Sequence, residues 1–437
     1  MPASDKATPN SSVMIHNMLA SAECCAELNV VPQANQEKHP AGNSSPPSGL
    51  STPKKELVWV DSKERLSEMA TSIRGISNAL SNINISLKVK AVAIITKLSD
   101  RELRPKLRQL VEYLLTTAAH PRDAATVVVY VQDFFKDIKE FGYEDIIAKT
   151  PQAQSHLKFW TPDLLQKQAD MIDLVITLGG DGTVLYTSWI FQSIVPPVLS
   201  FGLGSLGFMT ENVFENFKEV IDERIQSGIS CALRMRFHCM IWRSIDKAAG
   251  EHSMYALRKA IESSAELKEF PGYELEEEHV ILNDVVIDRG PNPTVGVTEL
   301  YGNHEFLTSI QADGVVISTP TGSTAYSMSA GGSLVHPDVP AILVTPVCPH
   351  SLSFRPLVLP DSMLLHLGVP YDARSSSYVS FDGKERVELG LGDCLTITAS
   401  SFPFPKVMAP NASTAAWVQR LGNSLHWNEL RRAKAFT

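Results

Sequence analysis

Between residues 89 and 202, short apolar runs alternate with longer stretches of helical periodicity. The apolar runs are VKAVAIIT (89–96), TVVVYVQ (126–132), LVITL (174–178) and PVLSFG (197–202). After the first run, apolar residues recur on one helical face, at Leu103, Leu107, Leu110, Val111 and Leu114. Strands that are apolar throughout and alternate with helices are typical of a parallel sheet covered on both faces. The pattern predicts a Rossmann-like α/β domain with a parallel sheet.

After about residue 230, apolar and polar positions alternate as they do in strands with one buried face. The run CALRMRFHCMIW (231–242) follows this alternation for much of its length. In ELYGNHEF (299–306), Gly302-Asn303 separates two strand-like runs and predicts a tight hairpin turn. Further strands are expected at 280–288, 314–319, 341–347, 377–382 and 393–399. The second half of the chain is therefore predicted to be β-rich and β-sandwich-like.

Two segments differ in composition from these domains. Residues 1–55 are rich in Ser, Pro, Asn and Ala, so they cannot bury enough apolar area to offset their chain entropy and are expected to be a disordered tail. The charged insert 247–278 is expected to be helical, exposed and dispensable. The expected division is a tail (1–55), an α/β domain (56–230), a β-rich domain (231–405) and a C-terminal segment that returns to the α/β domain (406–437), with a helical piece at 414–434.

Composition and charge exclude several classes of function. Of 437 residues, 44% are hydrophobic and 20% charged, as in an ordinary globular protein, and the net charge of −9 argues against binding nucleic acid or an anionic membrane. No apolar run approaches the roughly 18 residues that cross a bilayer. The first residues lack the features of a signal or transit peptide, so a cytoplasmic location is expected.

The six cysteines show no CxxC and no His/Cys spacing suited to zinc, so neither a structural metal site nor a disulfide framework is expected. Two of them lie in the tail, at Cys24 and Cys25. The other four are expected to be small, buried, reduced residues, at Cys231, Cys239, Cys348 and Cys394.

The strongest candidate for chemistry is the turn after the LVITL strand. Its residues are Gly179, Gly180, Asp181, Gly182 and Thr183. Ligands of parallel α/β sheets bind outside the carboxyl ends of the strands, and glycines there let backbone N–H groups approach phosphate oxygens. Asp181 is then suited either to accept the proton of an attacking hydroxyl or to help hold Mg²⁺. The structural alternative is that Asp181 only caps the helix and the glycines only turn the chain.

A second glycine-rich stretch, Gly202 to Gly207, matches the pattern GxGxxG of dinucleotide-binding dehydrogenases. It does not occupy the first βα turn of the domain, where that fingerprint belongs. We interpret it as a loop that lines the same cleft as the Asp181 turn.

The second strong block runs from Asp313-Gly314 through VVISTPTGSTAYSMSAGG (315–332). Its many hydroxyl groups suit a nucleoside, which needs small hydrogen-bonding partners and few charges, although a purely structural polar loop is the alternative. Upstream, Asn283-Asp284 places an amide and a carboxylate in a strand position, where both residue types are depleted. The pair is suited to bind ribose hydroxyls.

Taken together and in order, six motifs resemble the NAD kinase family: GGDGT (179–183), GSLGF (204–208), LND (282–284), DGVVISTPTGSTAYSMSAGG (313–332), CPHSLSFRP (348–356) and SFDGK (380–384). The string TPTGSTAYS is highly specific, whereas GGDGT also occurs in phosphofructokinases and in diacylglycerol and sphingosine kinases. The HSLSFRP and SFDG forms resemble eukaryotic members, and the tail resembles fungal ones. The resemblance implies ATP- and Mg²⁺-dependent phosphorylation of NAD at the 2′-hydroxyl of its adenosine ribose.

The resemblance also implies roles for single residues. Asp181 would be the proton acceptor with Gly182 beside the ligand, and Asn283 and Asp284 would hold the ribose hydroxyls of NAD. Phe208 would pack nearby, and the dinucleotide pocket would be lined by Asp313, Thr324, Ala325, Tyr326 and Ser327. Asp284 stands where many members have Glu, and Gln311-Ala312 where bacterial relatives often have a basic residue. No role is assigned to His350, Arg355 or Lys384.

The family resemblance further implies a homo-oligomer whose β-rich domains pack together and help to complete the nucleotide pocket. Two other functions remain open. A lipid kinase of the diacylglycerol or sphingosine type shares GGDGT, and a non-catalytic NAD-binding regulator would share the NAD-binding motifs. The choice of phosphoryl donor and the use of NADH also stay open.

Overall fold

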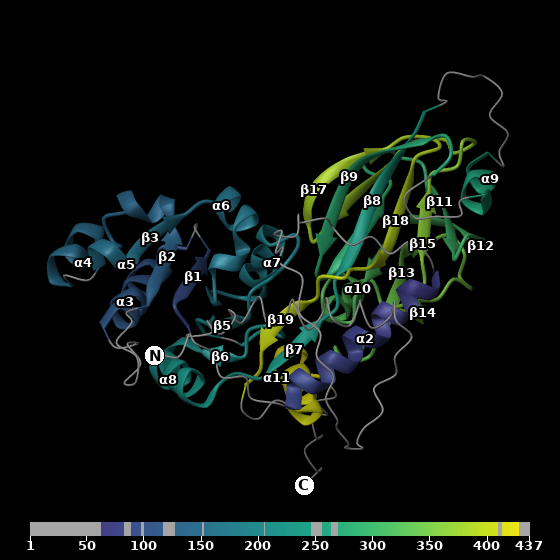
Figure 1. Cartoon of the computed structure of the whole chain (residues 1–437). Coiled ribbons are helices and arrows are strands. Elements are labelled where there is room, and N and C mark those ends of the chain that lie inside the picture. Colours follow the sequence, from purple (N-terminus) through teal and green to yellow (C-terminus); the bar gives the residue numbers. More distant parts are fainter. Residues whose placement is uncertain are drawn as a thin grey trace, which may run out of the picture.

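The computed structural model describes residues 63–82, 89–97, 100–116, 127–150, 153–204, 206–245, 256–263, 270–409 and 413–427. These residues form two lobes, one with a mainly parallel sheet and helices and one that is β-rich (Figure 1). The expected tail, with Cys24 and Cys25, lies outside the described residues. Among the described residues, no helix is long and apolar enough to cross a membrane.

The first lobe is built on a sheet with the strand order β3-β2-β1-β4-β5-β19-β7, in which β6 also pairs with β5. Six strands run parallel: β1 (Ala91–Thr96), β2 (Val128–Gln132), β3 (Leu157–Trp160), β4 (Leu174–Leu178), β5 (Val198–Gly202) and β6 (Asn212–Val213). β19 (Phe404–Val407) pairs in parallel with β5, and β7 (Cys231–Arg234) is antiparallel to β19. The predicted apolar strands of this domain are confirmed.

Helices cover both faces of this sheet. Accordingly, alternate residues of β1 point into two different hydrophobic clusters. Val92 and Ile94 belong to one hydrophobic cluster, whereas Ala93 and Ile95 belong to another. The helices are α3 (Leu103–Thr116), α4 (Tyr143–Lys149), α5 (Ala153–His156), α6 (Pro162–Lys167), α7 (Asp181–Ile190) and α8 (Phe217–Ser227), with 3₁₀ turns η1 (Asp133–Asp137), η2 (Ala169–Met171) and η3 (Phe214–Asn216). The doubly covered sheet predicted from the apolar runs is therefore present.

The second lobe is one antiparallel sheet around a main hydrophobic cluster, with the order β17-β16-β10-β12-β11-β15-β18-β8-β9, and with β13 paired to β12 and β14 paired to β13. The sheet curls until its end strands meet, since His279 on β9 lies 3.8 Å from Glu385 on β17 (Figure 1). Its strands are β8 (Phe237–Ser244), β9 (Tyr273–Ile281), β10 (Asp284–Asp288), β11 (Gly296–Gly302), β12 (Glu305–Ser318), β13 (Ala341–Pro349), β14 (Leu357–Pro360), β15 (Leu365–Gly368), β16 (Ser377–Phe381), β17 (Lys384–Leu389) and β18 (Cys394–Ala399). The predicted hairpin is present, but its turn is Asn303-His304, with φ of 50° and 71°, rather than Gly302-Asn303, because Gly302 still pairs with Glu305.

Three local expectations are wrong. The run 231–242 is two strands in different sheets, β7 and β8, because the chain crosses between the lobes at 235–236. The insert 247–278 includes helix α9 (Ala256–Ser263) and the start of strand β9, and Leu257 and Ile261 are buried in a cluster with Trp242. Finally, Cys348 is exposed rather than buried.

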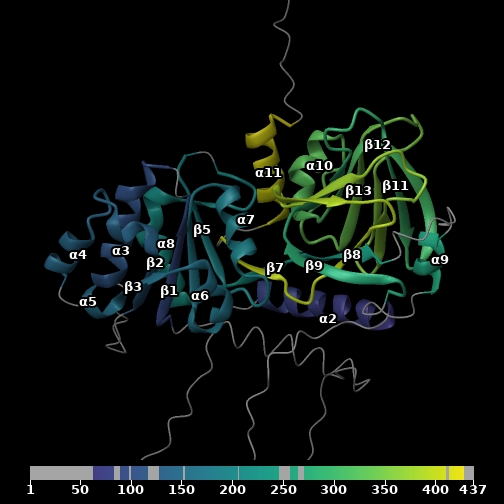
Figure 2. The same ribbon diagram turned by 90° about the horizontal axis from the view of Figure 1, so that it is seen from above.

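Two terminal helices lie across the junction of the lobes (Figure 2). α2 (Lys63–Asn82) runs beside β7, where the Leu233 N–H donates to Ser77 Oγ, and Arg74 forms an ion pair of 2.7 Å with Asp361. α11 (Thr414–Leu425) is capped by the Ser413 hydroxyl and follows β19. Both ends of the described chain therefore bind the two lobes together.

Candidate active site

The glycine-rich turn connects β4 to α7 at the carboxyl end of the parallel sheet. Gly179 has φ of +145°, and a Cβ there would come within 2.3 Å of Thr183 Oγ1, so a larger residue does not fit. Asp181 is the first residue of α7 and is half-buried, with Gly180 and Gly182 exposed on either side. The exposed start of this helix offers N–H groups and positive partial charge to an anion.

The Asp181 carboxylate is held by the loop after β5. Oδ1 accepts hydrogen bonds from the Met209 N–H (3.0 Å), the Thr210 N–H (3.1 Å) and the Thr210 hydroxyl (3.0 Å), whereas Oδ2 accepts one from the Phe208 N–H at 2.8 Å. A Cβ on Gly207 would lie 2.1 Å from Asp181 Oδ1. The last glycine of the GxGxxG-like stretch thus makes room for a carboxylate, which agrees with its interpretation as a loop of the same cleft.

On the other lobe, Asp382 holds the LND turn in place. Its carboxylate accepts the N–H groups of Leu282 (2.8 Å), Asn283 (2.7 Å) and Asp284 (3.1 Å), and its own N–H donates to the Asp284 carbonyl at 2.9 Å. Burial raises the pKa of Asp382, and these three hydrogen bonds oppose that rise. Asp382 was not among the predicted site residues, although the SFDGK motif that contains it was noticed.

Asn283 and Asp284 are both buried next to this turn. Asn283 is 7% exposed, and its Oδ1 has no hydrogen-bond partner among the described residues. Burial, followed by the charge of Asp382, raises the pKa of Asp284 to about 7, while a hydrogen bond from the Tyr326 backbone lowers it. A buried acceptor without a partner, beside a carboxylate with a perturbed pKa, indicates a binding site for a polar ligand.

The hydroxyl-rich loop packs directly on the LND turn. The Thr319 N–H donates to the Asn283 carbonyl (2.9 Å), and the Thr319 hydroxyl donates to the Leu282 carbonyl (2.6 Å). Gly322 lies so close that a Cβ would be 2.2 Å from the Asn283 carbonyl oxygen. The loop continues as η4 (Thr321–Thr324) and α10 (Tyr326–Ser329). The conformation of LND therefore depends on this loop as well as on Asp382.

The predicted pocket residues between Asp313 and Ser327 do not all face the same pocket. Thr324 and Ala325 are half-buried and Tyr326 is 45% exposed, so all three can reach a ligand. Ser327 is fully buried and its hydroxyl bonds the Thr345 hydroxyl at 2.8 Å, so it supports the loop from inside. Asp313 lies at the far end of β10 from Asp284, roughly 15 Å away by strand rise, and pairs with Arg289 at 2.8 Å.

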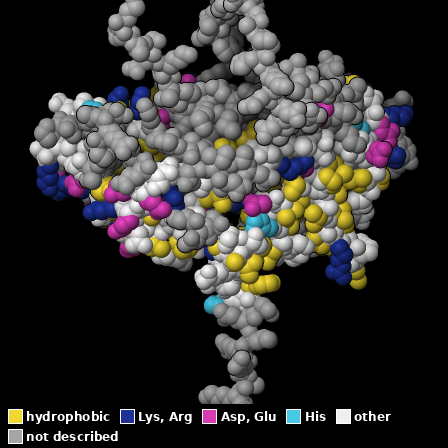
Figure 3. All heavy atoms as spheres, turned by 60° about the horizontal axis from the view of Figure 1, so that its bottom comes forward, with side chains coloured by type: hydrophobic (Ala, Val, Ile, Leu, Met, Phe, Trp, Pro, Cys, Tyr) yellow, Lys and Arg dark blue, Asp and Glu magenta, His cyan; other side chains and the backbone are white. Residues whose placement is uncertain are grey.

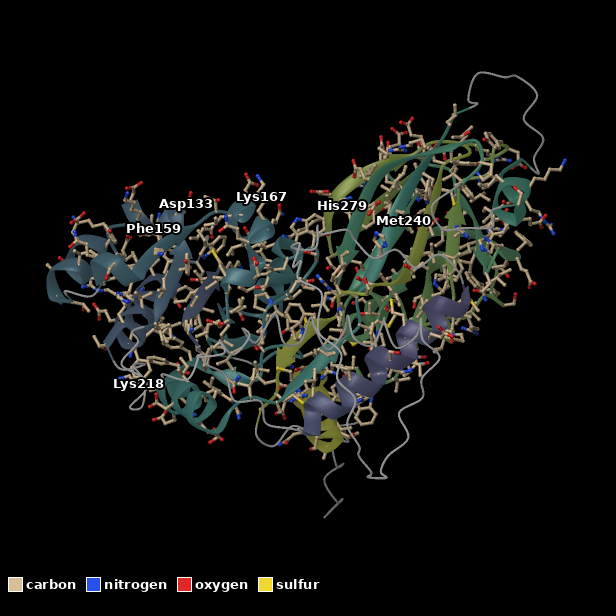
Figure 4. The ribbon with its side chains drawn as sticks, in the orientation of Figure 1. Asp133, Phe159, Lys167, Lys218, Met240 and His279 are labelled. Atoms are coloured by element: carbon tan, nitrogen blue, oxygen red, sulfur yellow. The ribbon has the colours of Figure 1, made fainter. Side chains whose placement is uncertain are left out.

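The two halves of the site meet through α7. Leu282 belongs to the same buried cluster as Val184 of α7 and Met209 of the Asp181 loop. Gln192, just after α7, exchanges hydrogen bonds of 2.8 and 3.2 Å with the Val280 backbone. His279 points from the edge of the β-rich lobe towards α7 (Figure 4), where it stacks on Trp189. The turn with Asp181 and the turn with Asn283 are thus parts of one junction.

Two basic residues at this junction were not predicted to have a role. Arg236 is fully buried and donates to the carbonyls of Phe191 (2.7 Å), Ser193 (2.7 Å) and Phe402 (2.6 Å), and burial lowers its pKa to about 9. Lys384 Nζ lies 4.3 Å from the centroid of the Tyr186 ring, and burial lowers its pKa. Arg236 lies in a run of alternating apolar and polar residues, so no signal in the sequence indicated that it is buried.

One group of side chains has spacing suited to a metal ion. The side chains of Glu277, His279 and Glu385 bring one ligand atom each within 4.8 Å of one another at the seam of the curled sheet. His279 Nε2 already forms a hydrogen bond of 3.0 Å with Glu277. Lys384, which carries an ammonium group, is adjacent to Glu385 in the sequence. The remaining lone pair of Asp181 Oδ2 has room either for Mg²⁺ carried with ATP or for a proton, but not for both at once.

A parallel α/β lobe with an aspartate-bearing glycine turn, joined to a β-rich lobe with a hydroxyl-rich loop, defines a nucleotide-binding phosphotransferase of two lobes. Family models agree with this class. The ATP-NAD kinase N-terminal domain matches residues 92–229, and the ATP-NAD kinase C-terminal domain matches residues 282–409. The chain belongs to the NAD kinase family, as its motifs predicted.

Similar proteins come from yeast and from an archaeon. The chain is 40% identical to the ATP-NADH kinase YEF1 and 42% identical to the NAD(+) kinase of Saccharomyces cerevisiae, in each case over 84% of its length; it spans 70% and 65% of those proteins. A crystal structure of yeast NADH kinase complexed with NADH has a TM-score of 0.63 at 29% identity, over 79% of this chain and 90% of that one. An NAD kinase from Archaeoglobus fulgidus in complex with ATP shares the fold, with a TM-score of 0.50 at 17% identity, over 76% of this chain and 100% of that one.

Proposed function

We propose that this chain transfers the γ-phosphoryl group of ATP to the 2′-hydroxyl of the adenosine ribose of NAD, which yields NADP and ADP. The observation that carries the proposal is the meeting of Asp181, at the exposed start of a helix, with the buried pair Asn283 and Asp284 across one junction. The names of the yeast relatives, an ATP-NADH kinase and an NAD(+) kinase, support the same reaction.

The hydrogen bonds of Asp181 support a particular route for the proton. Oδ1 accepts three donors, whereas Oδ2 accepts only the Phe208 N–H and keeps a lone pair. The 2′-oxygen forms its bond to the γ-phosphorus as the bond to the β,γ-bridging oxygen breaks, and the hydroxyl proton passes to Oδ2. Mg²⁺ bound with ATP would neutralise the charge that develops on the phosphate oxygens. General-base help of this kind contributes about 10²–10⁴ in rate.

The ribose is recognised on the β-rich lobe. The Asn283 Oδ1, which has no partner among the described residues, accepts a hydrogen bond from one ribose hydroxyl, and Asp284 accepts from the other. Tyr326 and Ala325 offer an exposed ring and a small side chain beside the base. NAD and NADH share this ribose, so these contacts do not discriminate between them.

The protein acts as a homo-oligomer in which the β-rich lobes pack together. Hydrophobic side chains gather on one side of that lobe (Figure 3), and its exposed apolar residues include Leu352 (89%), Leu357 (38%) and Val358 (54%), the last two on β14. Asp313 lies roughly 15 Å from Asp284 along the strands of one chain, so the two cannot contact the same ribose. A second copy that supplies Asp313 would complete the pocket.

The experiment that tests the function is an assay of purified protein with ATP, Mg²⁺ and either NAD, NADH or a lipid diol. The expected product is NADP, identified by a dehydrogenase that accepts only the 2′-phosphorylated form. Phosphorylation of the diol but not of NAD would favour a lipid kinase. NAD binding without turnover would favour a regulator. Replacing ATP with polyphosphate in the same assay identifies the phosphoryl donor.

A further inference from the structure

Three charged side chains meet behind the loop that holds Asp181. Glu211 Oε1 lies 2.8 Å from Lys406 Nζ and 3.0 Å from Arg420 Nη2. The side chains of Glu211 and Lys406 are each 6% exposed, and that of Arg420 is 18% exposed. They come from three distant segments: the loop after β5, strand β19 and helix α11 (Figure 1). Removing one partner from such a buried cluster leaves an uncompensated buried charge, so the three side chains depend on one another.

Their charges stabilise one another strongly. Burial alone would raise the pKa of Glu211, but the charges of Lys406 and Arg420 bring it below its usual value. Burial lowers the pKa of Lys406 to about 8, and the nearby carboxylate of Glu211 opposes that fall. The cluster carries two cations and one carboxylate, so each cation depends on Glu211.

The cluster connects to Asp181 through a single residue. Lys406 Nζ donates to the Phe208 carbonyl at 3.4 Å, and the Phe208 N–H donates to Asp181 Oδ2 at 2.8 Å. The next two residues of the loop bind Asp181 Oδ1, and the residue after them is Glu211 itself. Asp181 therefore binds residues 208–210 of this loop. The charged cluster contacts its first residue, Phe208, and includes its last residue, Glu211.

Helix α11 carries Arg420 and is itself anchored to the β-rich lobe. Trp417 packs edge-on against His336 at 5.1 Å between ring centroids, and Leu421 is buried. Figure 2 shows α11 at the junction of the lobes, beside α10. Arg420 thus connects an element fixed at the junction to the loop that orients the Asp181 carboxylate.

We infer that Glu211, Lys406 and Arg420 are positioning residues for the phosphoryl transfer. They keep the loop 208–210 on both oxygens of the Asp181 carboxylate, so that the remaining lone pair on Oδ2 points to the reacting hydroxyl. This inference rests on the proposed function. A misplacement of about 1 Å at a reacting group can cost roughly 100-fold in rate. Loosening the loop therefore lowers kcat, while the residues that bind ATP and NAD keep their places.

The test uses Arg420→Gln, because it leaves the Glu211–Lys406 pair intact. The expected result is a fall in kcat of roughly 10- to 100-fold with the KM of NAD and ATP within about twofold, and substantial rescue by Arg420→Lys. Arg74→Gln is the matched control, since Arg74 also joins a terminal helix to a buried carboxylate, Asp361, but has no contact with the loop. It is expected to lower the melting temperature and to leave kcat unchanged. Equal losses of kcat in both Gln variants would overturn the inference.

A second readout separates this inference from the proposed function. Hydrogen exchange at the amides of residues 208–210 is expected to be faster in Arg420→Gln than in the wild type and in Arg74→Gln. Unchanged exchange in Arg420→Gln overturns the inference, whatever the enzyme does. A wild-type protein that does not phosphorylate NAD overturns the proposed function instead, and the exchange result stands independently.

Discussion

At the residue scale, the two oxygens of Asp181 differ in their hydrogen bonding, and this difference decides what the side chain can do. Three donors occupy Oδ1 and one occupies Oδ2. A residue that only capped α7 would bond the N–H groups of its own helix, but these four bonds come from residues 208–210. The capping alternative therefore has no support in the geometry.

Replacement of Asp181 by Asn is expected to lower kcat by about 10²–10⁴ while the affinity for NAD stays within several-fold. The amide cannot accept a proton, and a base that acts only in the transition state affects turnover rather than binding. Steady-state kinetics and NAD titration measure the two effects, with Asp163→Asn, an exposed residue of α6, as the control. An Asp181→Asn enzyme with most of the wild-type kcat would exclude the assignment.

Replacement of Asn283 by Ala is expected to raise the KM of NAD roughly two- to tenfold, because a hydrogen bond between two neutral groups contributes about 0.5–1.5 kcal/mol. The KM of ATP is expected to change little, since the glycine turn lies on the other lobe. Initial rates at varied NAD and varied ATP separate the two. Equal weakening of both substrates would show that Asn283 supports the fold instead.

Asp284 predicts a pH dependence of stability. Its pKa is about 7 in the folded chain and near 3.8 when unfolded, so the folded state binds the proton more tightly. The stability that this proton contributes is complete below about pH 4 and is lost as the pH rises through 7. The wild type therefore loses on the order of 4 kcal/mol over this range relative to Asp284→Asn. Melting curves of both proteins from pH 4 to 8 measure this; a constant difference would contradict it.

At the scale of elements, α7 joins the two lobes. Its first residue is Asp181, and its last carbonyls point at Arg236, which comes from the crossing between β7 and β8. Cations are stabilised at helix C-termini, where carbonyls lack partners within the helix. Gln192, Trp189 and Arg236 together fix the end of α7 to the β-rich lobe, and so they set where Asp181 stands relative to Asn283.

Replacement of Arg236 by Met is expected to destabilise the protein by several kcal/mol, because it leaves buried carbonyls of Phe191, Ser193 and Phe402 without donors. Chemical denaturation gives the free energy of unfolding. Arg386→Met is the control: Arg386 is 53% exposed, and its pair with Asp288 is expected to contribute less than about 1 kcal/mol. Similar losses in both variants would show that Arg236 has no special role.

At the scale of the whole molecule, one chain holds most of the predicted site but leaves Asp313 apart. The register of β10 with β12 pairs Asp284 with Ser318 and Asp288 with Gly314, so Asp313 cannot approach Asp284 without breaking the sheet. A symmetric contact between β-rich lobes is the simplest way to bring the two together.

Co-expression of Asp181→Asn with Asp313→Ala is therefore expected to restore about a quarter of the wild-type activity per site, because half of randomly mixed dimers contain one intact pocket. Each variant alone is expected to be nearly inactive. The control pair is Asp181→Asn with Asn283→Ala, which belong to the same chain's part of the pocket and are expected to give no more activity than the Asn283→Ala chains supply alone. Mixed oligomers without recovered activity would place Asp313 outside the pocket.

The sequence by itself determined the class of each lobe, the turn at Asp181 and the family. Runs such as LVITL reveal buried parallel strands because their periodicity is local, and the Gly179 turn needs a conformation that few other residues adopt. The string TPTGSTAYS identified the family because its residues are contiguous in the sequence. The curled sheet, the crossing at 235–236 and the burial of α9 were not predicted, since strand pairing and packing depend on partners far away in the chain.

Only the tertiary structure decided which side chains serve the site and how. Asp382 meets the LND turn across about a hundred residues, and Arg420 meets Glu211 across about two hundred, so no local pattern could join them. Ser327 shares a motif with Tyr326 but turns into the core, because a four-residue helix sends neighbouring side chains in different directions. The roles of these residues follow from burial and distance, which a sequence does not contain until it is folded.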